Sequence, residues 1–404
     1  MDFPYIKQII VHNCYASKGF NIPNAPLETF KHIIITGLNG SGKTTILKRT
    51  AEVLNNIRKG KTKEAALKQL KSRLQANQDH PIADDLKKQI FALESIDLLY
   101  LNTKQITYAK EVENVDPFVF AFYKAQRTVN LADVKSVTTE MEFLKIVKKT
   151  DEISEFTHHL KQYLVNKKVY EAFDYLNNKE NNKNQTKEFF ENLTNTLRKV
   201  FNDLNLKLEF TQEDFEFYII LGDGRKLTFN QLSEGFSAFL SIILDLMIRI
   251  DIIRKEKKDF NFQPEGIVLI DEPETHLHLS MQYEMLPLIS ILFPKIQLII
   301  ATHSPAIISS LKDAIVFDLS TKDEISDKVL GSSYSELMIT HFGLDNEYSP
   351  VADKIIDDVN KAVADKNLEA LQKILDANDR YLTPVLKLDI EGIINRLNKA
   401  DKND

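Results

Sequence analysis

Short hydrophobic runs along the chain predict the strands of a central sheet. Residues 5–12 and 31–36 are apolar runs of strand length near the N-terminus, and residues 117–123 form another. Residues 266–271 and 297–302 are hydrophobic at nearly every position, which is typical of strands covered on both faces in a parallel sheet. Because parallel strands need helical connections that cross back over the sheet, the pattern predicts an α/β fold.

Longer stretches carry hydrophobic residues at helical spacing. Residues 46–57 have them three and four positions apart, directly after a glycine-rich segment, which predicts a helix. Residues 58–97 repeat this spacing in two charged arms separated by a His-Pro pair, which predicts a helical hairpin. The polar tract at residues 177–185 predicts a loop inside a longer helical region, and the chain after Phe317 is mostly helical and polar.

These elements predict one large head followed by a smaller tail. The head covers residues 1–345 and is interrupted by the helical hairpin at about 57–97 and by a helical region at about 130–205. Residues 346–404 form a C-terminal helical tail.

Composition narrows the class of protein. The chain is 43% hydrophobic and 27% charged, and no apolar run approaches the ~18 residues that cross a bilayer, so no membrane segment or membrane partner is expected. The N-terminus lacks the pattern of a secretory signal, and Cys14 is the only cysteine, which together predict a cytoplasmic location. The net charge of −6 argues against a protein coated in positive charge.

A phosphate-binding loop is the strongest chemical signal. The segment GLNGSGKTT at residues 37–45 fits the pattern G-x-x-x-x-G-K-[ST] between a predicted strand and a predicted helix. Glycines let backbone N–H groups face the phosphates, and the helix N-terminus adds partial positive charge. Lys43 would neutralise the β- and γ-phosphates, and the Thr44 hydroxyl would ligate Mg²⁺. The predicted nucleotide-binding residues here are Gly37, Asn39, Gly40, Ser41, Gly42, Lys43, Thr44 and Thr45. The alternative is an ordinary glycine-rich turn that begins a helix.

Two adjacent acids end the predicted strand at residues 266–271. Ligands of open α/β sheets lie at the carboxyl ends of the strands, so Asp271 can hold Mg²⁺ through a bound water while Glu272 faces an attacking water. The alternative is that the two acids cap the next helix.

A third motif, LSEGF at residues 232–236, opens a long apolar helix. Alone it is weak, because Ser followed by Glu also caps many helices. Its place in the chain is informative. Ser233 lies 38 residues before Asp271, and His303 follows 32 residues after Asp271 at the end of another apolar strand.

The order of these motifs resembles that of the ABC ATPase superfamily, with Walker A at 37–44, the signature at 232–236, Walker B ending at Asp271, and the switch histidine at His303. The resemblance implies an ABC-type P-loop NTPase head with a mainly parallel sheet, an N-terminal antiparallel β part and helical insertions. It also implies a homodimer or higher homo-oligomer that closes around ATP and Mg²⁺.

The same resemblance assigns roles across the dimer. Ser233 and Gly235 of one subunit would contact the γ-phosphate of ATP held by the other subunit. His303 would sense that phosphate and help to hold Glu272 and the water in line, while residues 273–277 would match the loop that crosses the dimer seam. The predicted catalytic residues are Glu272, His303 and Lys43.

The signature and the metal site depart from the family pattern. Glu234 and Phe236 stand where many ABC signatures have Gly and Gln, so the contact across the dimer stays open. The glutamine that reaches Mg²⁺ in relatives has no clear motif; Gln126 is the candidate that joins Thr44 and Asp271 as a metal residue. Arg127 beside Gln126 is another candidate for a role at the site. Phe20 lies where an aromatic ring could stack on adenine or could simply pack in the core.

About 190 residues separate the first two motifs, more than in transporter ATPases. The phrases ITGLNGSGKTTILK, LSEGF and IDEPETHLH followed by ATHSP resemble the RecF, SMC and OLD branch over about residues 5–317. That resemblance implies work in DNA repair or anti-phage defence beside a nuclease or toxin partner protein. Residues 318–404 offer no strand-borne acid pair of the kind a Toprim nuclease needs, so nuclease activity would come from the partner.

DNA is a further candidate partner. Residues 58–73 carry seven basic side chains against a single acid, Glu64. Such an excess can bind phosphates, although a charged helical face is equally consistent with plain solvation.

The sequence therefore predicts an ATPase that dimerises around ATP and uses the cycle to control DNA engagement or an effector partner. The alternative hypothesis is an ATP-stabilised scaffold or sensor that holds a nuclease or toxin partner with little turnover.

Overall fold

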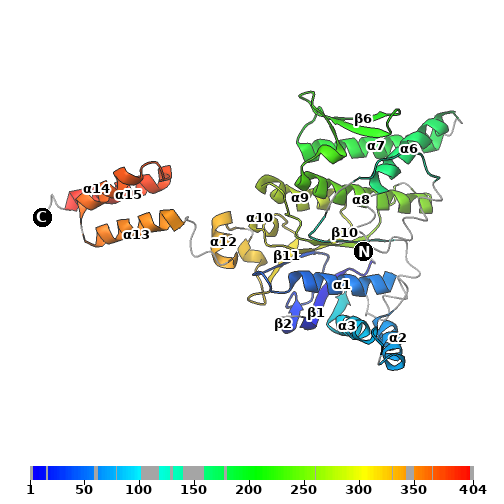
Figure 1. The fold of residues 1–404 in the computed structure, drawn as a ribbon, viewed down its shortest axis with the longest axis horizontal. Coiled ribbons are helices and arrows are strands. Elements are labelled where there is room, and N and C mark those ends of the chain that lie inside the picture. The colour runs from blue at the N-terminus through cyan, green and yellow to red at the C-terminus, as the bar shows by residue number, and fades with distance from the viewer. Residues whose placement is uncertain are drawn as a thin grey trace. The chain divides into compact units, whose positions relative to one another are not determined.

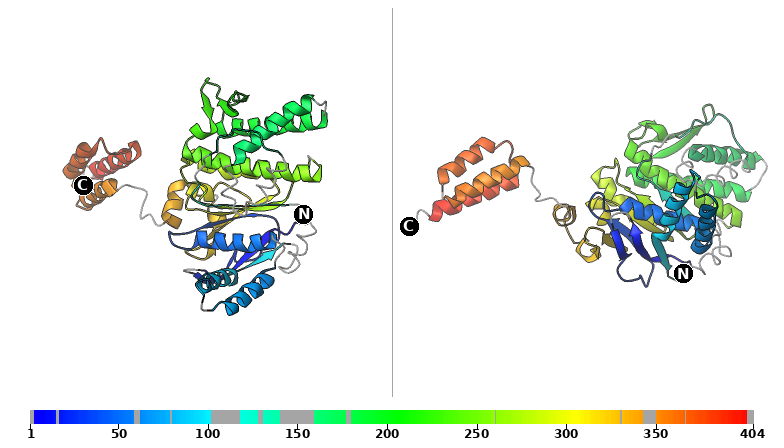
Figure 2. Two further views of the ribbon diagram at one scale, coloured as in Figure 1. Left: turned by 45° about the vertical axis from the view of Figure 1, so that its right-hand side comes forward. Right: turned by 60° about the horizontal axis from the view of Figure 1, so that its bottom comes forward.

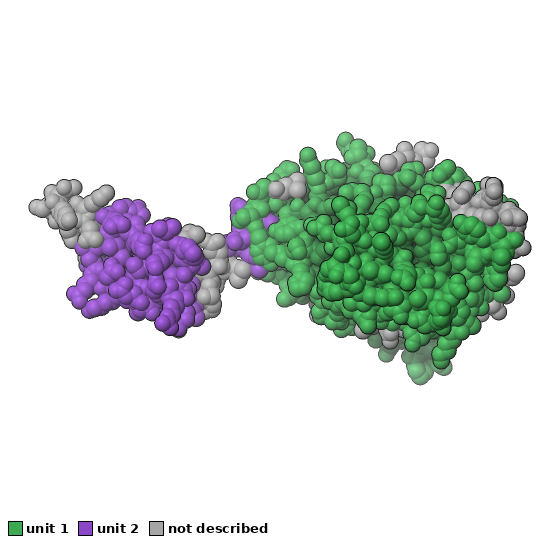
Figure 3. Space-filling model, turned by 90° about the horizontal axis from the view of Figure 1, so that it is seen from above, with its two compact units in different colours: residues 1–334 green, residues 335–404 purple. Residues whose placement is uncertain are grey.

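A computed structural model gives the fold of two compact units, residues 1–334 and residues 335–404 (Figure 3). The residues that the structure describes are 3–14, 17–58, 62–78, 80–101, 118–127, 131–139, 159–176, 180–259, 261–329, 331–342, 350–365 and 367–400. Among them, no helix is long and apolar enough to cross a membrane.

A six-stranded sheet forms the centre of the first unit. Its order is β12–β11–β3–β10–β9–β5, and every neighbouring pair is parallel except β11 with β12. The strands are β3 (His32–Thr36), β5 (Val119–Tyr123), β9 (Gly266–Asp271), β10 (Ile296–Ala301), β11 (Ala314–Asp318) and β12 (Asp323–Glu324). All residues of β3, β9, β10 and β11 are buried, as their continuous hydrophobicity predicts.

The register of the parallel strands aligns their carboxyl ends. Ala301 pairs with Ile35 on one side and with Asp271 on the other, and Asp318 pairs with Thr36. The segments that follow these strands therefore leave the sheet along one edge. This edge carries the predicted phosphate loop, the acid pair and the switch histidine.

Helices cover both faces of the central sheet (Figures 1 and 2). Helix α1 (Lys43–Arg58) lies on one face, and α8 (Glu234–Lys257) and α9 (Leu279–Leu292) lie on the other. The short α10 (Pro305–Ile308) follows β10, and α11 (Ser326–Val329) follows β12. Two covered faces explain why the strands have no polar alternation.

An antiparallel sheet packs beside α1, in the order β2–β1–β4. Its strands are β1 (Ile6–Cys14), β2 (Ser17–Ile22) and β4 (Ile96–Tyr100). One core joins its side chains to those of α1 and of the central strands, including Ile33, Ile267 and Ile299. The buried Gln297 side chain fastens the two sheets, because it accepts from Ile6 N and donates to Ile6 O at 2.9 and 2.7 Å.

Two helical segments interrupt this frame. Helices α2 (Lys63–Ala76) and α3 (Ala83–Glu94) form a hairpin between α1 and β4. Helices α6 (Leu160–Leu176) and α7 (Glu180–Phe201) pack with α8 and with the antiparallel sheet β6–β7–β8 in a second core. That sheet consists of β6 (Lys207–Thr211), β7 (Glu216–Ile220) and β8 (Lys226–Thr228), and the 3₁₀ turn η2 (Phe229–Gln231) precedes α8.

The second unit is helical. It contains α13 (Pro350–Ala364), α14 (Leu368–Asn378) and α15 (Pro384–Ala400), and α12 (Tyr334–Phe342) begins at the boundary between the units. Leu371, Val359 and Ile390 belong to a core made only of residues of this unit.

The fold class predicted from the sequence is confirmed, with a mainly parallel sheet and separate antiparallel parts. The loop predicted at residues 177–185 is wrong for residues 180–185, which lie in α7; residues 177–179 lie outside the described residues. The polar residues there extend a helix whose later turns bury Phe189, Leu193 and Leu197, so composition was a poor guide.

Candidate functional site

The glycine-rich segment joins β3 to α1 in a conformation that needs its glycines. Gly37, Gly40 and Gly42 have φ angles of 135°, 79° and 101°, which side chains with a Cβ rarely adopt. A Cβ on Gly37 would also lie 3.0 Å from the Ser320 hydroxyl, and that hydroxyl accepts a bond of 2.8 Å from Leu38 N. The turn after β11 thus supports the start of the loop.

Lys43 is the first residue of α1, and it is buried against its own loop. Its ammonium donates to the carbonyl oxygens of Gly37 and Leu38 at 2.8 and 3.1 Å, and to Ser41 Oγ at 3.4 Å. Burial lowers the pKa of Lys43 to about 8, although Glu272 and other nearby acids oppose the shift. Asn39 and Gly40 are exposed at the tip, while Thr44 and Thr45 are half-buried.

Thr44 and Asp271 meet although 227 residues separate them. The Thr44 hydroxyl donates to Asp271 Oδ1 at 3.0 Å, and Asp271 is only 2% exposed. Burial raises the pKa of Asp271, and the bond from Thr44 opposes that shift. A hydroxyl and a buried carboxylate are hard oxygen donors of the kind that Mg²⁺ prefers, so these two residues fit a magnesium ion.

Glu272 has an unusual backbone conformation, with a φ angle of 46°. Hydrogen bonds on both sides hold it: Glu272 N donates to Ala301 O at 2.8 Å, and the Thr275 hydroxyl donates to Glu272 O at 2.9 Å. A non-glycine residue held in the left-handed region costs free energy and often marks a functional position.

His303 lies just after β10, in what we call the switch loop, residues 302–304. Burial lowers the pKa of His303, the nearby Lys43 lowers it further, and Glu272 raises it. The charges of both predicted catalytic groups therefore act on the ring. The structure brings together Lys43, Thr44, Asp271, Glu272 and His303.

Arg127 reaches this edge of the sheet, whereas Gln126 does not contact it through any described hydrogen bond. The Arg127 guanidinium donates to the carbonyl oxygens of Asp271 and Glu272 at 3.0 and 2.8 Å. Gln126 is exposed. Of the two neighbouring candidates, Arg127 therefore holds the backbone of the acid pair, and Gln126 stays a prediction as a metal residue.

The signature segment meets the loop after Walker B, residues 272–278, which we call the seam loop. A Cβ on Gly235 would lie 2.1 Å from the carbonyl oxygen of His276, so only glycine fits at this contact. Ser233 precedes α8, its hydroxyl does not cap the helix, and its side chain is exposed. An exposed hydroxyl at a helix N-terminus is free to meet a phosphate from another molecule.

The remaining features noted in the sequence have these contacts. Phe20 stacks on Phe317, with 6.1 Å between ring centroids, and packs against the core. In the basic hairpin, Lys63 is buried and paired with Asp97, and Lys71 pairs with Glu94 at 2.7 Å; Lys59 and Lys61 lie outside the described residues. His276 and His278 are exposed, and no group of three metal-ligating side chains occurs in the described ranges.

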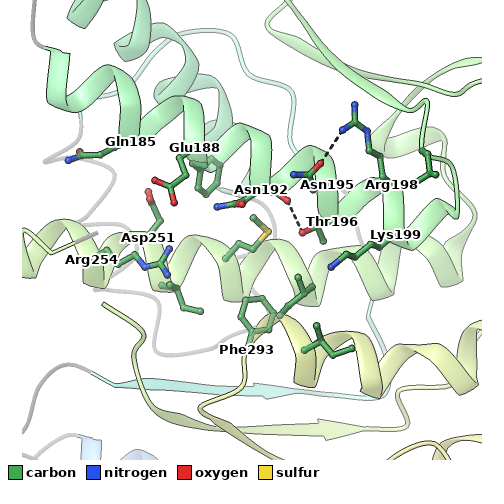
Figure 4. A pocket seen from close by; sticks show the side chains of 16 residues that line it. Gln185, Glu188, Asn192, Asn195, Thr196, Arg198, Lys199, Asp251, Arg254 and Phe293 are labelled. Carbon is green, nitrogen blue, oxygen red and sulfur yellow. Dashed lines mark hydrogen bonds between the residues drawn. The ribbon is translucent and has the colours of Figure 1, made fainter. Parts of the chain in front are cut away.

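A cavity of about 640 Å³ lies between α7, α8 and α9, apart from these residues (Figure 4). Its lining includes the apolar side chains of Met247, Ile250 and Phe293 and the polar side chains of Asn192 and Lys199. It contains none of the predicted nucleotide-site residues.

Sequence reasoning missed Glu274 and underrated Arg127. Glu274 Oε1 accepts hydrogen bonds from the Thr302 hydroxyl and from His303 N at 2.7 and 2.8 Å. The nearest sequence signal was the position of Glu274 in the predicted seam segment 273–277.

Known proteins share parts of this chain. Residues 142–309 match the protein family described as "AAA domain, putative AbiEii toxin, Type IV TA system". Septu protein PtuA of Bacillus thuringiensis is 27% identical over 193 residues, which cover 45% of this chain and 49% of the relative. Retron Ec83 probable ATPase of Escherichia coli is 35% identical over 103 residues, which cover 26% of this chain and 18% of the relative.

The chain therefore spans about half or less of the length of these curated relatives. A crystal structure of an SMC head bound to the C-winged helix domain of ScpA overlaps 80% of this chain and 97% of that chain, with a TM-score of 0.39 and 13% identity. The match to an AAA domain family and the similarity to the Septu protein and the retron ATPase confirm the resemblance to ATPases that the sequence motifs indicated.

Proposed function

We propose that the chain is an ABC-type ATPase that binds ATP with Mg²⁺, dimerises around it and hydrolyses it. The observation that carries this proposal is the meeting of three distant segments at one edge of the sheet. Thr44 bonds to Asp271, and Glu272 and His303 are fixed beside them.

The phosphate loop and the acid pair would bind different parts of the ATP–Mg²⁺ complex. The ammonium of Lys43, now on the loop carbonyls, would bind the β- and γ-phosphates. Thr44 and Asp271 would hold Mg²⁺, which would supply positive charge that neutralises the phosphates. Arg127 keeps the acid pair in place through its two backbone contacts.

Glu272 is the general base of this scheme. It follows Asp271 directly, so it can face a water in line with the γ-phosphate while Asp271 faces the metal. His303, near both Lys43 and Glu272, would contact the γ-phosphate and hold the water in line. In-line attack needs this positioning more than any covalent chemistry from the protein.

A second copy of the chain would complete the site. The exposed Ser233 hydroxyl at the tip of α8 would contact the γ-phosphate of ATP held by the partner, with Gly235 allowing the tip to sit on the seam loop. The positive end of the α8 dipole would favour that contact.

The relatives support a proposed biological role. Similarity to a Septu protein and a retron ATPase favours anti-phage defence over DNA repair. In that role the ATP cycle would control a nuclease or toxin partner, or the engagement of DNA. Pairing of Lys63 and Lys71 within the chain leaves less free charge for DNA in the hairpin.

Replacing Glu272 by Gln tests the reaction. The variant should bind ATP and form dimers, because the amide keeps the size of the side chain, but phosphate release should fall about 100-fold or more through loss of the general base. Steady-state phosphate release and light scattering with ATP and Mg²⁺ measure the two properties.

Unchanged phosphate release in the Glu272→Gln variant would rule out the proposed base. A wild-type protein that dimerises with ATP but releases almost no phosphate would instead support the scaffold or sensor hypothesis. Glu234 and Phe236, which depart from the usual ABC signature, are consistent with that hypothesis.

A further inference from the structure

Glu274 is a carboxylate that none of the roles above employs. It lies in the seam loop, and burial raises its pKa. Its Oε1 atom accepts from the Thr302 hydroxyl at 2.7 Å and from the backbone N–H of His303 at 2.8 Å. One oxygen thus contacts two consecutive residues of the switch loop.

These bonds join two loops that come from neighbouring strands. The seam loop follows β9, and the switch loop follows β10. Two further bonds lie beside these loops: Glu272 N donates to Ala301 O, at the end of β10, at 2.8 Å, and the Ser304 hydroxyl donates to Gln282 Oε1, on α9, at 2.6 Å. The bond from Glu274 is the one that acts on His303 itself.

The main chain of His303 sets the position of its Cβ atom, and so the region that its imidazole ring can reach. The charges of Lys43 and Glu272, the groups that would act on the γ-phosphate and the water, act on that ring. A backbone N–H shielded from water needs an acceptor, and loss of that acceptor costs free energy. Loss of that acceptor would free the loop and displace the ring from the reacting atoms.

We propose that Glu274 is a positioning residue for the ATP hydrolysis proposed above, on which this inference rests. Its carboxylate holds the Thr302 hydroxyl and the His303 amide, and so fixes the imidazole in the place where it meets the γ-phosphate. Glu274 itself touches neither ATP nor water. Its action is on the rate of the chemical step, not on nucleotide binding.

Two substitutions separate positioning from acid–base chemistry. Glu274→Gln keeps a carbonyl oxygen that accepts both hydrogen bonds but cannot act as a base. Glu274→Ala removes the acceptor. We expect Glu274→Gln to keep kcat within a few-fold of wild type and Glu274→Ala to lower kcat about 100-fold, the loss that a misplacement of about 1 Å can cause, with KM for ATP nearly unchanged.

The control is Glu284→Ala, on the exposed surface of α9 outside these contacts, which should match wild type. Unfolding temperatures of all variants verify that each is folded. An equal loss in Glu274→Gln and Glu274→Ala, or wild-type kcat in Glu274→Ala, would overturn the proposal.

A second measurement does not depend on turnover. The chain has nine histidines, so histidine-selective ¹⁵N labelling gives a simple amide spectrum, and a His303→Gln variant identifies the His303 signal. That signal should move in Glu274→Ala and stay near its place in Glu274→Gln. If wild type does not hydrolyse ATP, the proposed function fails, and an unmoved His303 signal in Glu274→Ala would refute the bond from Glu274 separately.

Discussion

His32 is a buried titratable residue at the start of β3 that takes no part in the nucleotide chemistry. Its Nδ1 accepts from Leu298 N at 3.0 Å, and its Nε2 lies 3.3 Å from Ser290 Oγ. Burial lowers the pKa of His32 to about 4, against a weak opposing effect of Asp313. A neutral imidazole is therefore part of the fold at neutral pH.

This burial makes the free energy of unfolding depend on pH. Above pH 6.5, His32 is neutral in both states and causes no loss. As the pH falls from 6.5 toward 4, the unfolded chain binds a proton that the folded chain does not, so stability decreases. We expect His32 to contribute a loss of about 2 kcal/mol between about pH 7.5 and about pH 5, measured by urea denaturation.

The matched variant is His32→Asn, whose side-chain oxygen can still accept from Leu298 N but does not titrate. Other groups also titrate over this range, so the quantity of interest is the difference between the two proteins. If the variant loses as much stability as wild type on acidification, His32 is not the source of the pH dependence.

Single residues differ in how far sequence reveals them. Lys43, Asp271 and Glu272 could be proposed from their types and spacing, because phosphate and metal chemistry restricts which residues serve. Arg127 and Glu274 form hydrogen bonds with backbone groups of distant segments. Because many polar side chains of suitable length can form such bonds, their residue types do not reveal these contacts. Only the folded chain shows which ones do.

Helices α6 and α8 are fastened by a buried ion pair. Lys167 donates to Asp251 Oδ2 at 2.6 Å, and the Tyr163 hydroxyl donates to the same oxygen. The two charged side chains are only 4% and 8% exposed. Asp251 also lines the cavity of Figure 4. A buried charge without its partner is strongly destabilising.

Replacing Lys167 by Met should therefore lower the free energy of unfolding by about 3 kcal/mol, because Asp251 stays buried without its cation. Adding Asp251→Asn to that variant should recover part of the loss, since the amide is neutral and still accepts from Tyr163. Urea denaturation of the single and double variants measures both effects.

An exposed pair supplies the control. On α7, Lys187 Nζ lies 3.8 Å from Glu191 Oε1, and both side chains are more than half exposed. Lys187→Met should change stability by less than about 1 kcal/mol. Equal losses of unfolding free energy in Lys167→Met and Lys187→Met would show that the buried pair stabilises the protein no more than the exposed pair.

At the scale of elements, hydrophobic pattern was informative where burial is continuous and weak elsewhere. The buried runs at β9 and β10 predicted their strands. The strand β11 is equally buried but only five residues long, and no strand was predicted there. Its pairing with β3 depends on a contact between segments that the local pattern does not contain.

At the scale of the whole molecule, the two units have separate cores. The side chains of the core around Leu371 come only from residues 355–394, while the cores around α1 and α8 lie in the first unit. All of the candidate nucleotide residues belong to the first unit. The proposed reaction therefore concerns residues 1–334.

The proposed site is complete only when two chains meet, so the most direct test uses two defective chains. Lys43→Ala removes phosphate binding, and Ser233→Arg blocks the tip of α8. Each homodimer should be inactive. A heterodimer of the two variants, isolated with two affinity tags, has one site with an intact Lys43 and an intact Ser233 from opposite chains.

We predict that this heterodimer releases phosphate at about half the wild-type rate per dimer, because one of its two sites is intact. If both proteins are folded and associated yet the heterodimer is as inactive as the two homodimers, Ser233 does not act across the dimer, and the account of a shared ATP site is contradicted.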